Sequence, residues 1–455
     1  MTHLGNHAVV IGGSMAGLMT ARVLADHFDQ VTVLERDQIE DRPAIHKSIP
    51  QGNHLHALML GGQQVLSLLY PNFTDKLRSL GAVRLRGGKD AAIVLADGKA
   101  YSLTGSVREP RDLGYDFHCQ SRGLLEHCVR QCTRACGNLT LRSACSVQGL
   151  IWQNERIHGV RFTHDGDSES LTADLIVDTG GRGSRVPRWL TEIGFQVPSE
   201  TTIGVDFAYS SAKFRIPGYN GEPERLLAFF GPVPQCPNGA FFAPIENDTW
   251  HLSLFGRFGD YPPTDEEGFL AFAKSLHTQL LYEIIKDAER VSDIVQHRFP
   301  TSVQRHYERL PRFPERLLVL GDAISSFNPV YGQGMSSAAL QVRELQDLLR
   351  ERSEDSGSLE GLALDFFAKA AEVIATPWAL AAASDFAFPK TTGERPPNAE
   401  EGASYFAALD ALQVEDTELA RLLSDVFNLA KPLSVLYEEP LRSRVAAHQH
   451  RLVNS

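Results

Sequence analysis

The chain has 455 residues and a formal net charge of −12, with 44 Lys and Arg against 56 Asp and Glu. This length predicts two or three subdomains, and the acidic balance argues against a nucleic-acid surface, which needs clustered Lys and Arg. Because the start of the chain lacks a basic-then-apolar leader and no run of about 18 apolar residues could span a bilayer, we expect a cytoplasmic protein without a transmembrane segment.

The first predicted element is a βαβ unit at residues 8–37. It opens with AVVI, a run that is typical of a buried parallel strand. Gly12, Gly13 and Gly17 follow, then apolar residues at helical spacing, and a second apolar run ends on Glu35. A strand, a glycine turn and a helix within a unit of about 30 residues predict a dinucleotide site.

Each residue type has a physical role in such a site. Gly12 permits the tight turn, Gly13 lets the backbone approach a pyrophosphate at the helix N-terminus, and Gly17 lets the helix pack closely on the strand. Glu35 accepts hydrogen bonds from a ribose and disfavours a 2′-phosphate, so the dinucleotide is FAD or NAD rather than NADP. The alternative is an ordinary βα turn, since the G-G-x-x-x-G spacing is looser than the strict fingerprint. The predicted contacts are Gly12, Gly13, Ser14, Met15, Ala16, Gly17, Glu35 and Arg36.

A loop and a helix are predicted after this unit. The loop at residues 49–56 (IPQGNHLH) contains Pro and Gly, and its position predicts that it lies beside the cofactor. His54 and His56 either contact a ligand there or are hydrogen-bonded structural histidines. Residues 58–80 predict one helix that ends at Gly81.

A second helix is predicted at residues 122–136, with Ser121 as its N-cap. Arg122 then lies in the first turn, where the helix dipole disfavours a cation. An anionic cofactor segment would stabilise it, and simple solvent exposure is the alternative. Five of the six cysteines lie between residues 119 and 145. We interpret them as small core hydrophobes because their spacings fit neither zinc nor a disulfide framework, and we expect no metal site.

The centre of the chain predicts a second ligand loop and an antiparallel sheet. Residues 173–184 form a buried strand that ends in a glycine-rich loop. Residues 201–258 alternate and are rich in aromatic side chains, which predicts antiparallel strands with one apolar face. Some of these side chains are core, and others could line an apolar cavity beside the cofactor. The candidate substrate contacts are His54, His56, Phe207, Phe229 and Phe242.

The third motif is a strand, a polar glycine-rich loop and a helix at residues 317–336. Asp322 can hold a ribityl hydroxyl, and the N–H groups around Gly334 can stabilise negative charge on a reduced flavin ring. After a linker at residues 353–358, the last hundred residues are predicted to be mainly helical.

Together the three motifs resemble the FAD-dependent monooxygenases of the para-hydroxybenzoate hydroxylase fold. They are GGSMAG with Glu35, DTGGRGS at residues 178–184 and GDAISSFNPVYGQGMS at residues 321–336. The phrases IPQGNHLHAL, DTGGRGS and FNPVYGQGMS are most similar to the flavin epoxidases of polyether biosynthesis and their bacterial relatives. The resemblance implies an α/β chain with a Rossmann-like FAD-binding domain at residues 1–200 and 300–352. It also implies an inserted antiparallel-sheet substrate domain at residues 201–299 and a helical C-terminal region at residues 353–455.

The resemblance also implies roles for individual residues. Arg122 contacts the flavin side of FAD, Asp322 holds the ribityl chain, and a short loop borders the flavin ring. That loop comprises Pro329, Val330, Tyr331, Gly332, Gln333 and Gly334, and the cofactor set further includes Arg122, Asp322, Gly332, Gly334 and Met335. Hydroxylases that bind nicotinamide directly usually carry Asp-Gly where this chain has Thr179-Gly180-Gly181-Arg182. Electrons from NAD(P)H therefore arrive directly or through a separate flavin reductase.

The implied activity is a monooxygenase reaction. Reduced FAD would capture O2 as a flavin hydroperoxide and pass one oxygen, by epoxidation or hydroxylation, to an apolar, unsaturated or aromatic natural-product-like substrate. We assign no protein acid or base. The nearest alternative is an alkene (prenyl-chain) reductase of the same fold, which would turn over without oxygen. A flavin halogenase is disfavoured because the motif Trp-x-Trp-x-Ile-Pro is missing, and a flavin-binding partner without turnover is a further alternative.

Overall fold

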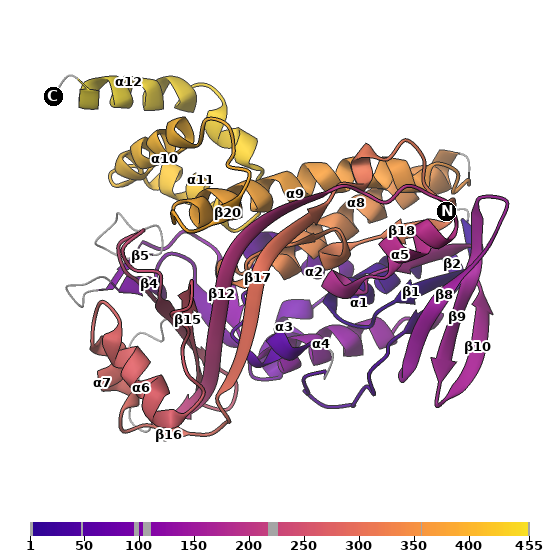
Figure 1. The fold of residues 1–455 in the computed structure, drawn as a ribbon, viewed down its shortest axis with the longest axis horizontal. Coiled ribbons are helices and arrows are strands. Elements are labelled where there is room, and N and C mark those ends of the chain that lie inside the picture. The colour runs from indigo at the N-terminus through magenta and orange to yellow at the C-terminus, as the bar shows by residue number, and fades with distance from the viewer. Residues whose placement is uncertain are drawn as a thin grey trace.

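A five-stranded parallel sheet organises one half of the molecule and takes its last strand from residues 317–319 (Figure 1). The computed structural model describes residues 3–46, 49–94, 100–102, 111–216, 226–355 and 357–453. The sheet order is β18-β11-β1-β2-β7, and all its pairings are parallel. Its strands are β1 (Gly5–Ile11), β2 (Phe28–Leu34), β7 (Leu139–Arg142), β11 (Leu175–Asp178) and β18 (Leu317–Val319). The three predicted motifs begin at neighbouring strands of this sheet, β1, β11 and β18, so they meet at one edge.

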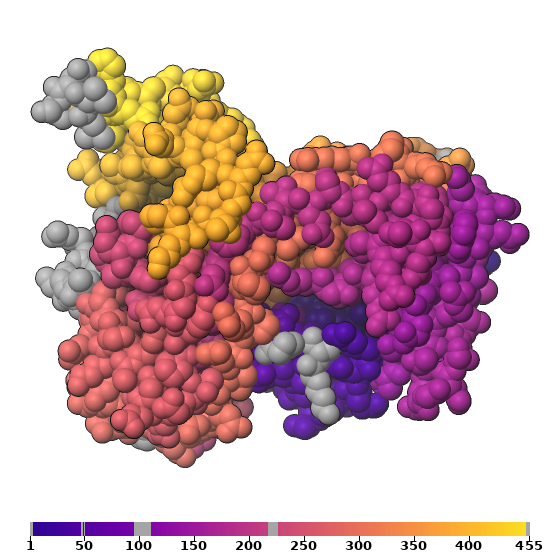
Figure 2. All heavy atoms as spheres, in the orientation of Figure 1, coloured from indigo at the N-terminus to yellow at the C-terminus, as the bar shows by residue number. Residues whose placement is uncertain are grey.

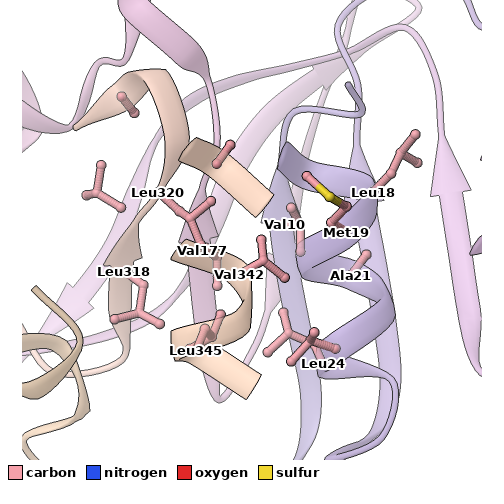
Figure 3. Close-up of a cluster of buried hydrophobic side chains, with 14 of the residues drawn as sticks. Val10, Leu18, Met19, Ala21, Leu24, Val177, Leu318, Leu320, Val342 and Leu345 are labelled. Carbon is pink, nitrogen blue, oxygen red and sulfur yellow. The ribbon is translucent and has the colours of Figure 1, made fainter. Parts of the chain in front are cut away.

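Two helices pack on this sheet and fix the first glycine turn. They are α1 (Met15–Leu24) and α8 (Gly334–Asp355). Figure 3 shows their side chains interleaved with those of the strands, and every labelled residue is fully buried. These residues are Val10, Leu18, Met19, Ala21, Leu24, Val177, Leu318, Leu320, Val342 and Leu345. Because burial of one large aliphatic side chain contributes about 1.5–3 kcal/mol, this cluster holds the first and third motifs together.

A larger, mixed sheet forms the second half of the molecule. Its order is β19-β17-β12-β15-β14-β13-β4-β5, with β16 and β20 paired to β12. Two long strands, β12 (Glu200–Arg215) and β17 (Val295–Arg305), cross the middle of the molecule between the two halves (Figure 1). The others are β4 (Ala91–Val94), β5 (Ala100–Ser102), β13 (Leu226–Phe230), β14 (Gly239–Ile245), β15 (Thr249–Arg257), β16 (Glu289–Arg290), β19 (Ser325–Ser326) and β20 (Thr392–Gly393). One face is packed against α6 (Glu266–Ser275) and α7 (Leu280–Ile285).

This sheet differs in two respects from the predicted antiparallel sheet of residues 201–299. It takes in β4 and β5, which come from a segment that we assigned to the FAD-binding domain. In addition, β4 pairs with β13 in the parallel direction, so the sheet is mixed. Pattern in the sequence predicts which segments are strands, but partners far apart in the chain are selected by tertiary packing.

Two small sheets complete the strands. One contains β8 (Cys145–Gln153), β9 (Arg156–His164) and β10 (Asp167–Thr172) and lies at the right of Figure 1. The other pairs β3 (Val83–Arg86) with β6 (Asp116–Cys119). The strand β6 leads into α4 (Arg122–Arg134), which begins as predicted after Ser121. The Ser121 Oγ accepts a hydrogen bond from the Leu124 N–H at 3.2 Å, and the predicted N-cap is confirmed.

The predicted helix at residues 58–80 is two helices. They are α2 (Leu60–Leu69) and α3 (Phe73–Ser79). Pro71 and Asn72 separate them, because a proline cannot continue the hydrogen bonding of a helix and Asn72 adopts a left-handed conformation with φ of 60°. The prediction of one continuous helix is therefore wrong.

The remaining helices include the C-terminal set. They are α5 (Val186–Glu192), α9 (Leu362–Phe386), α10 (Ala399–Gln413), α11 (Thr417–Phe427) and α12 (Leu441–Val453). By length and composition α9 could cross a membrane, contrary to our expectation, although half of its most apolar window is buried inside the protein. Its residues Phe366, Phe367 and Ile374 belong to the main core. A core helix passes the same test, so α9 is weak support for a membrane span.

Candidate active site

A cavity of about 1050 Å³ lies between the parallel sheet and the mixed sheet. Figure 2 shows the surface hollowed between the segments around residues 250–300 and those around residues 150–200, with N-terminal residues at the floor. Most of the predicted cofactor residues line this cavity. They are Gly12, Ser14, Met15, Ala16, Glu35, Arg36, Arg122, Asp322, Gly332, Gly334 and Met335. The tertiary structure therefore brings the three motifs to one place.

The turn after β1 requires glycine at two positions. Gly12 has φ of 103°, which side chains rarely adopt, and its N–H donates to Leu34 O at 2.9 Å. A Cβ on Gly17 would overlap the carbonyl oxygen of Gly12. The predicted roles of these two glycines, the tight turn and the close helix packing, are confirmed. Gly17 does not itself line the cavity.

Gly13 has a role that the sequence argument did not predict. It is not among the cavity-lining residues, and a Cβ built on it would lie 2.9 Å from the Glu35 Cβ. Its N–H donates to Glu35 Oε2 at 2.6 Å, and the Asp37 N–H donates to Glu35 Oε1 at 2.9 Å. Gly13 therefore makes room for Glu35 and orients its carboxylate, and its approach to a pyrophosphate stays a prediction.

Arg122 is buried, so the solvent-exposure alternative is wrong. Its Nη2 donates to Ser14 Oγ at 2.9 Å and to Glu126 Oε1 at 3.1 Å, while its Nε has no partner in the described part of the chain. Ser14 Oγ also donates to Glu126 Oε1. Burial raises the pKa of Glu126, but Arg122 and the Ser14 hydrogen bond outweigh it and bring that pKa below its usual value. Glu126, which we did not predict, thus orients Arg122 as an ionised partner.

Asp322 lines the cavity without a hydrogen bond to any residue that the structure describes. Burial raises the pKa of its carboxyl group, and the charges of Arg122 and Arg182 oppose that shift. The preceding residue, Gly321, has φ of 73° and donates its N–H to Gln341 Oε1 at 2.8 Å. A partly buried carboxylate that faces a cavity is stabilised by a hydrogen-bond donor, and the hydroxyls of a ribityl chain would supply one.

The predicted flavin-ring loop lies between Asp322 and α8. All six residues from Pro329 to Gly334 line the cavity. Asn328 Oδ1 accepts the Val330 N–H at 3.2 Å, and Gly332 has φ of 65°. Because Gly334 and Met335 begin α8, the positive end of that helix dipole faces the cavity and would stabilise a negative charge there. Asp322, Arg122, Glu35 and this helix end together fit an FAD.

Only two of the five predicted substrate residues line the cavity, His56 and Phe207. Phe229 and Phe242 are fully buried in the cluster beneath α6 and α7, on the opposite face of the mixed sheet. Neighbouring residues of a strand point to opposite faces, so Phe242 is core while Phe241 lines the cavity. The residues that sequence reasoning missed are Tyr209, Phe241, Phe255, His297 and Phe299. The alternation of side chains along a strand separates its two faces, but it does not show which face packs in the core and which lines the cavity.

The two histidines of the predicted loop have different positions: His54 is a structural residue, and His56 lines the cavity. His54 is buried outside the cavity lining, where its Nδ1 lies 2.7 Å from Ser211 Oγ and its ring is edge-on to Tyr209 at 3.9 Å. Burial lowers the pKa of His54 to about 2. His56 lines the cavity with Nδ1 2.9 Å from His54 O. Burial, and then the charge of Arg122, lower the pKa of His56 to about 4, so both rings are neutral near pH 7.

The C-terminal helices form part of the cavity wall, which the sequence did not indicate. Phe406 and Leu409 of α10 and Leu423 and Ser424 of α11 are among the lining residues. The Tyr115 hydroxyl, also in the lining, lies 2.7 Å from Ser424 Oγ. The helical C-terminal region is therefore part of the candidate active site and not an appended domain.

One group of described residues could hold a metal ion by geometry alone. Glu35, Asp37 and His46 offer ligand atoms within 4.8 Å of one another. Both carboxylate oxygens of Glu35 already accept backbone N–H groups, and the side chain lines the cavity where a ribose is predicted. We therefore interpret this group as part of the nucleotide site.

No protein-family model matches the chain, but comparison with individual proteins finds relatives that match three quarters of it or more. Protein Rv3254 of Mycobacterium tuberculosis is 31% identical, and the match covers 98% of this chain and 94% of that protein. Squalene epoxidase 3 of Arabidopsis thaliana is 24% identical over 75% of this chain and 59% of its own length.

Two solved structures share the fold. The flavin-dependent brominase Bmp2 superposes with a TM-score of 0.68 at 13% identity, covering 99% of this chain and 100% of that one. PqsL, a probable FAD-dependent monooxygenase from Pseudomonas aeruginosa, has a TM-score of 0.58 at 18% identity, covering 93% and 100%. The predicted fold class, an α/β FAD-binding fold with a substrate sheet and C-terminal helices, is confirmed.

Proposed function

Because the chain belongs to the family that includes Protein Rv3254 and is an FAD-dependent oxidoreductase of the monooxygenase family, we propose that it transfers one oxygen atom from O2 to an apolar, unsaturated or aromatic small molecule. The observation that carries this proposal is the aromatic wall beside the loop at residues 329–334. Phe207, Phe241 and Phe255 line the same cavity as that loop. Such a wall binds an apolar substrate and keeps water away from the reacting atoms.

FAD, when bound, supplies the oxidation chemistry, and the protein supplies position and electrostatics. Glu35 would accept the hydroxyls of the adenosine ribose, and Arg122, oriented by Glu126, would contact the anionic side of the cofactor. Asp322 would accept ribityl hydroxyls. The N-terminus of α8 would stabilise negative charge on the ring. The neutral rings of His56 and His297 can exchange hydrogen bonds with a substrate without adding charge to the cavity.

Epoxidation of an alkene is the favoured form of this reaction. A relative named squalene epoxidase matches three quarters of the chain, and an apolar, aromatic-lined cavity suits an uncharged alkene. The test supplies the FAD-loaded protein, a flavin reductase and NADH with candidate alkenes under ¹⁸O₂. We expect one ¹⁸O atom in the product. An alkane formed without oxygen would identify an alkene reductase, and product formation that requires bromide or chloride would identify a halogenase.

We further propose that electrons reach the flavin through a separate reductase. The support is the middle loop, where Thr179, Gly180 and Gly181 replace the Asp-Gly usual in hydroxylases that bind nicotinamide. Anaerobic stopped-flow mixing of the FAD-loaded protein with NADH or NADPH and substrate tests this proposal. We expect slow bleaching that a flavin reductase accelerates. Bleaching at about 1 per second or faster without the reductase would show direct reduction.

A further inference from the structure

We propose that α10 and α11 form a second compartment of the cavity, which binds the far end of an elongated, uncharged substrate through neutral hydrogen-bonding groups. This inference rests on the proposed function, since it assumes that the near end of the substrate lies at the loop of residues 329–334. It assigns a binding role to the C-terminal region.

The cavity is continuous from the nucleotide end to the C-terminal helices. At one end it is lined by Cys145 and Val147 of β8, and at the other by residues of α10 and α11. These elements lie on opposite sides of the molecule in Figure 1. The predicted cofactor residues line the region of the cavity between β8 and Met335. The rest of the cavity, from Phe255 to α11, is left for the substrate, so a substrate that fills this region is elongated.

Apolar side chains form most of the wall of this compartment. Leu409 of α10 and Leu423 of α11 are both almost completely buried and both line the cavity. Leu113, Phe117 and Leu226 face the same cavity from the first half of the chain and the mixed sheet. This wall suits a hydrocarbon chain, which gains affinity in proportion to the apolar area that leaves water.

A neutral polar cluster lies at the end of the compartment. Tyr115 OH lies 2.7 Å from Ser424 Oγ, and Asn428 Nδ2 donates to Tyr115 OH at 3.3 Å. Burial raises the pKa of Tyr115, so the phenol keeps its proton. Asn428 also lines the cavity. Its Nδ2 donates to Ser424 O at 2.9 Å as well, so the carbonyl oxygen of its amide is the group that can accept a hydrogen bond from a ligand. A hydroxyl, ketone or amide at the end of a substrate could exchange hydrogen bonds with these groups.

The charges near the cluster disfavour an anionic end group. Asp410 lies at the exposed rim of the cavity, where it would repel a carboxylate or a phosphate. The nearby cation Arg421 is paired with an acid of its own helix, because its Nε donates to Asp425 Oδ1 at 2.8 Å. Its guanidinium also stacks over the Tyr115 ring at 5.1 Å. The end group is therefore expected to be uncharged.

A structural role of the same residues is the competing explanation. The bond between Tyr115 and Ser424 also ties the segment before β6 to α11. Two variants separate the explanations, Ala407→Trp, which adds a large side chain at an exposed lining position of α10, and Asn428→Leu, which removes the amide. The matched control is Ala403→Trp, because Ala403 is an exposed residue of the same helix that does not line the cavity.

The experiment measures binding to the FAD-loaded protein by isothermal titration calorimetry, without turnover. The probes are linear alkenes of short, medium and long chain, ending in a methyl, hydroxyl or carboxylate group. We expect wild type and Ala403→Trp to prefer long chains and to bind the hydroxyl end about tenfold more tightly than the carboxylate, which corresponds to about 1.4 kcal/mol. Ala407→Trp should bind short chains as tightly as long ones, and Asn428→Leu should lose the preference for the hydroxyl.

Two results would overturn the inference. One is an unchanged preference for chain length in Ala407→Trp, and the other is tight binding of the carboxylate series. Oxygen transfer to short alkenes, at a rate that Ala407→Trp does not change, would reject the second compartment and keep the proposed function. Binding that follows the expected pattern without any ¹⁸O in a product would keep the compartment and reject oxygen transfer.

Discussion

The Tyr331 hydroxyl donates a hydrogen bond to Asp385 Oδ1 at 2.7 Å, which joins a cavity-lining loop residue to the C-terminal helix α9. The same oxygen accepts Arg257 Nη1 and Asn328 Nδ2, both at 2.8 Å. Asp385 is fully buried and Arg257 nearly so. One carboxylate oxygen of α9 thus binds both the loop at residues 329–334 and Arg257 of the mixed sheet. This fixes the loop relative to the substrate wall.

The first prediction concerns the stability of this network. Asp385→Ala leaves Arg257 buried without its counterion, and we expect the free energy of unfolding to fall by about 3–5 kcal/mol. Tyr331→Phe removes the hydrogen bond donated to Asp385 and the longer one accepted from Arg257 Nη2 at 3.3 Å, and should cost about 1–2 kcal/mol. Urea denaturation of the apoprotein measures both. The control is Glu192→Ala, which breaks the exposed pair with Arg188 and should cost less than about 1 kcal/mol. Equal losses in Asp385→Ala and the control would contradict the prediction.

The second prediction concerns the residue beside Glu35. Gly13→Ala places a Cβ 2.9 Å from the Glu35 Cβ and displaces the carboxylate predicted to hold the adenosine ribose. We expect FAD affinity, measured by fluorescence titration, to fall at least about tenfold, or 1.4 kcal/mol. Gly137→Ala is the control, since a Cβ there has no neighbour within 4 Å among the described residues. If both variants bind FAD like wild type, Glu35 does not hold the ribose.

The third prediction concerns Asp322. Its carboxylate makes no hydrogen bond within the described chain, so Asp322→Ala removes no internal bond and should leave the apoprotein as stable as wild type. FAD affinity should nevertheless fall about tenfold, because a charged hydrogen bond to the ribityl chain contributes roughly 1.5–3 kcal/mol. Thermal unfolding with and without FAD measures both quantities. A loss of about 1 kcal/mol in the apoprotein with unchanged FAD affinity would indicate a turn or cap role instead.

The fourth prediction concerns pH. Burial raises the pKa of Asp178 to about 6, although Ser184 Oγ and the Gly180 N–H both donate to its carboxylate and oppose that shift. The unfolded pKa is about 4, so the fold favours the protonated form. Asp178 therefore stabilises the protein fully below about pH 4, and this contribution is lost as pH rises through about 6, by up to about 3 kcal/mol.

Asp178→Asn isolates this contribution from those of other titrating groups. Relative to the variant, wild-type apoprotein should lose stability between about pH 4 and about pH 7 in urea denaturation. The difference between the two proteins should level off above the folded pKa. A constant difference across this range would mean that Asp178 titrates in the fold as it does in the unfolded chain.

Local sequence was sufficient for the elements whose geometry depends on neighbouring residues. The strand, turn and helix around Gly12 and Gly17, the N-cap at Ser121 and the strand before Asp322 follow from backbone sterics and hydrogen bonding within a few residues. The order of the three motifs also predicted the fold class. The same local reasoning missed the break at Asn72, because an apolar periodicity continues across Pro71 although the helix cannot.

Tertiary structure decided what each residue faces. Sequence alternation marked Phe241 and Phe242 as opposite faces of a strand, but only the packing of α6 and α7 made Phe242 core and left Phe241 in the cavity. Contacts between residues far apart in the chain, such as Gly13 with Glu35 and Tyr115 with Ser424, cannot be predicted from the spacing of apolar residues in either segment. The sequence by itself therefore determined the cofactor motifs, because they are local. The substrate compartment was decided by tertiary structure, because it is formed where two sheets and the C-terminal helices meet.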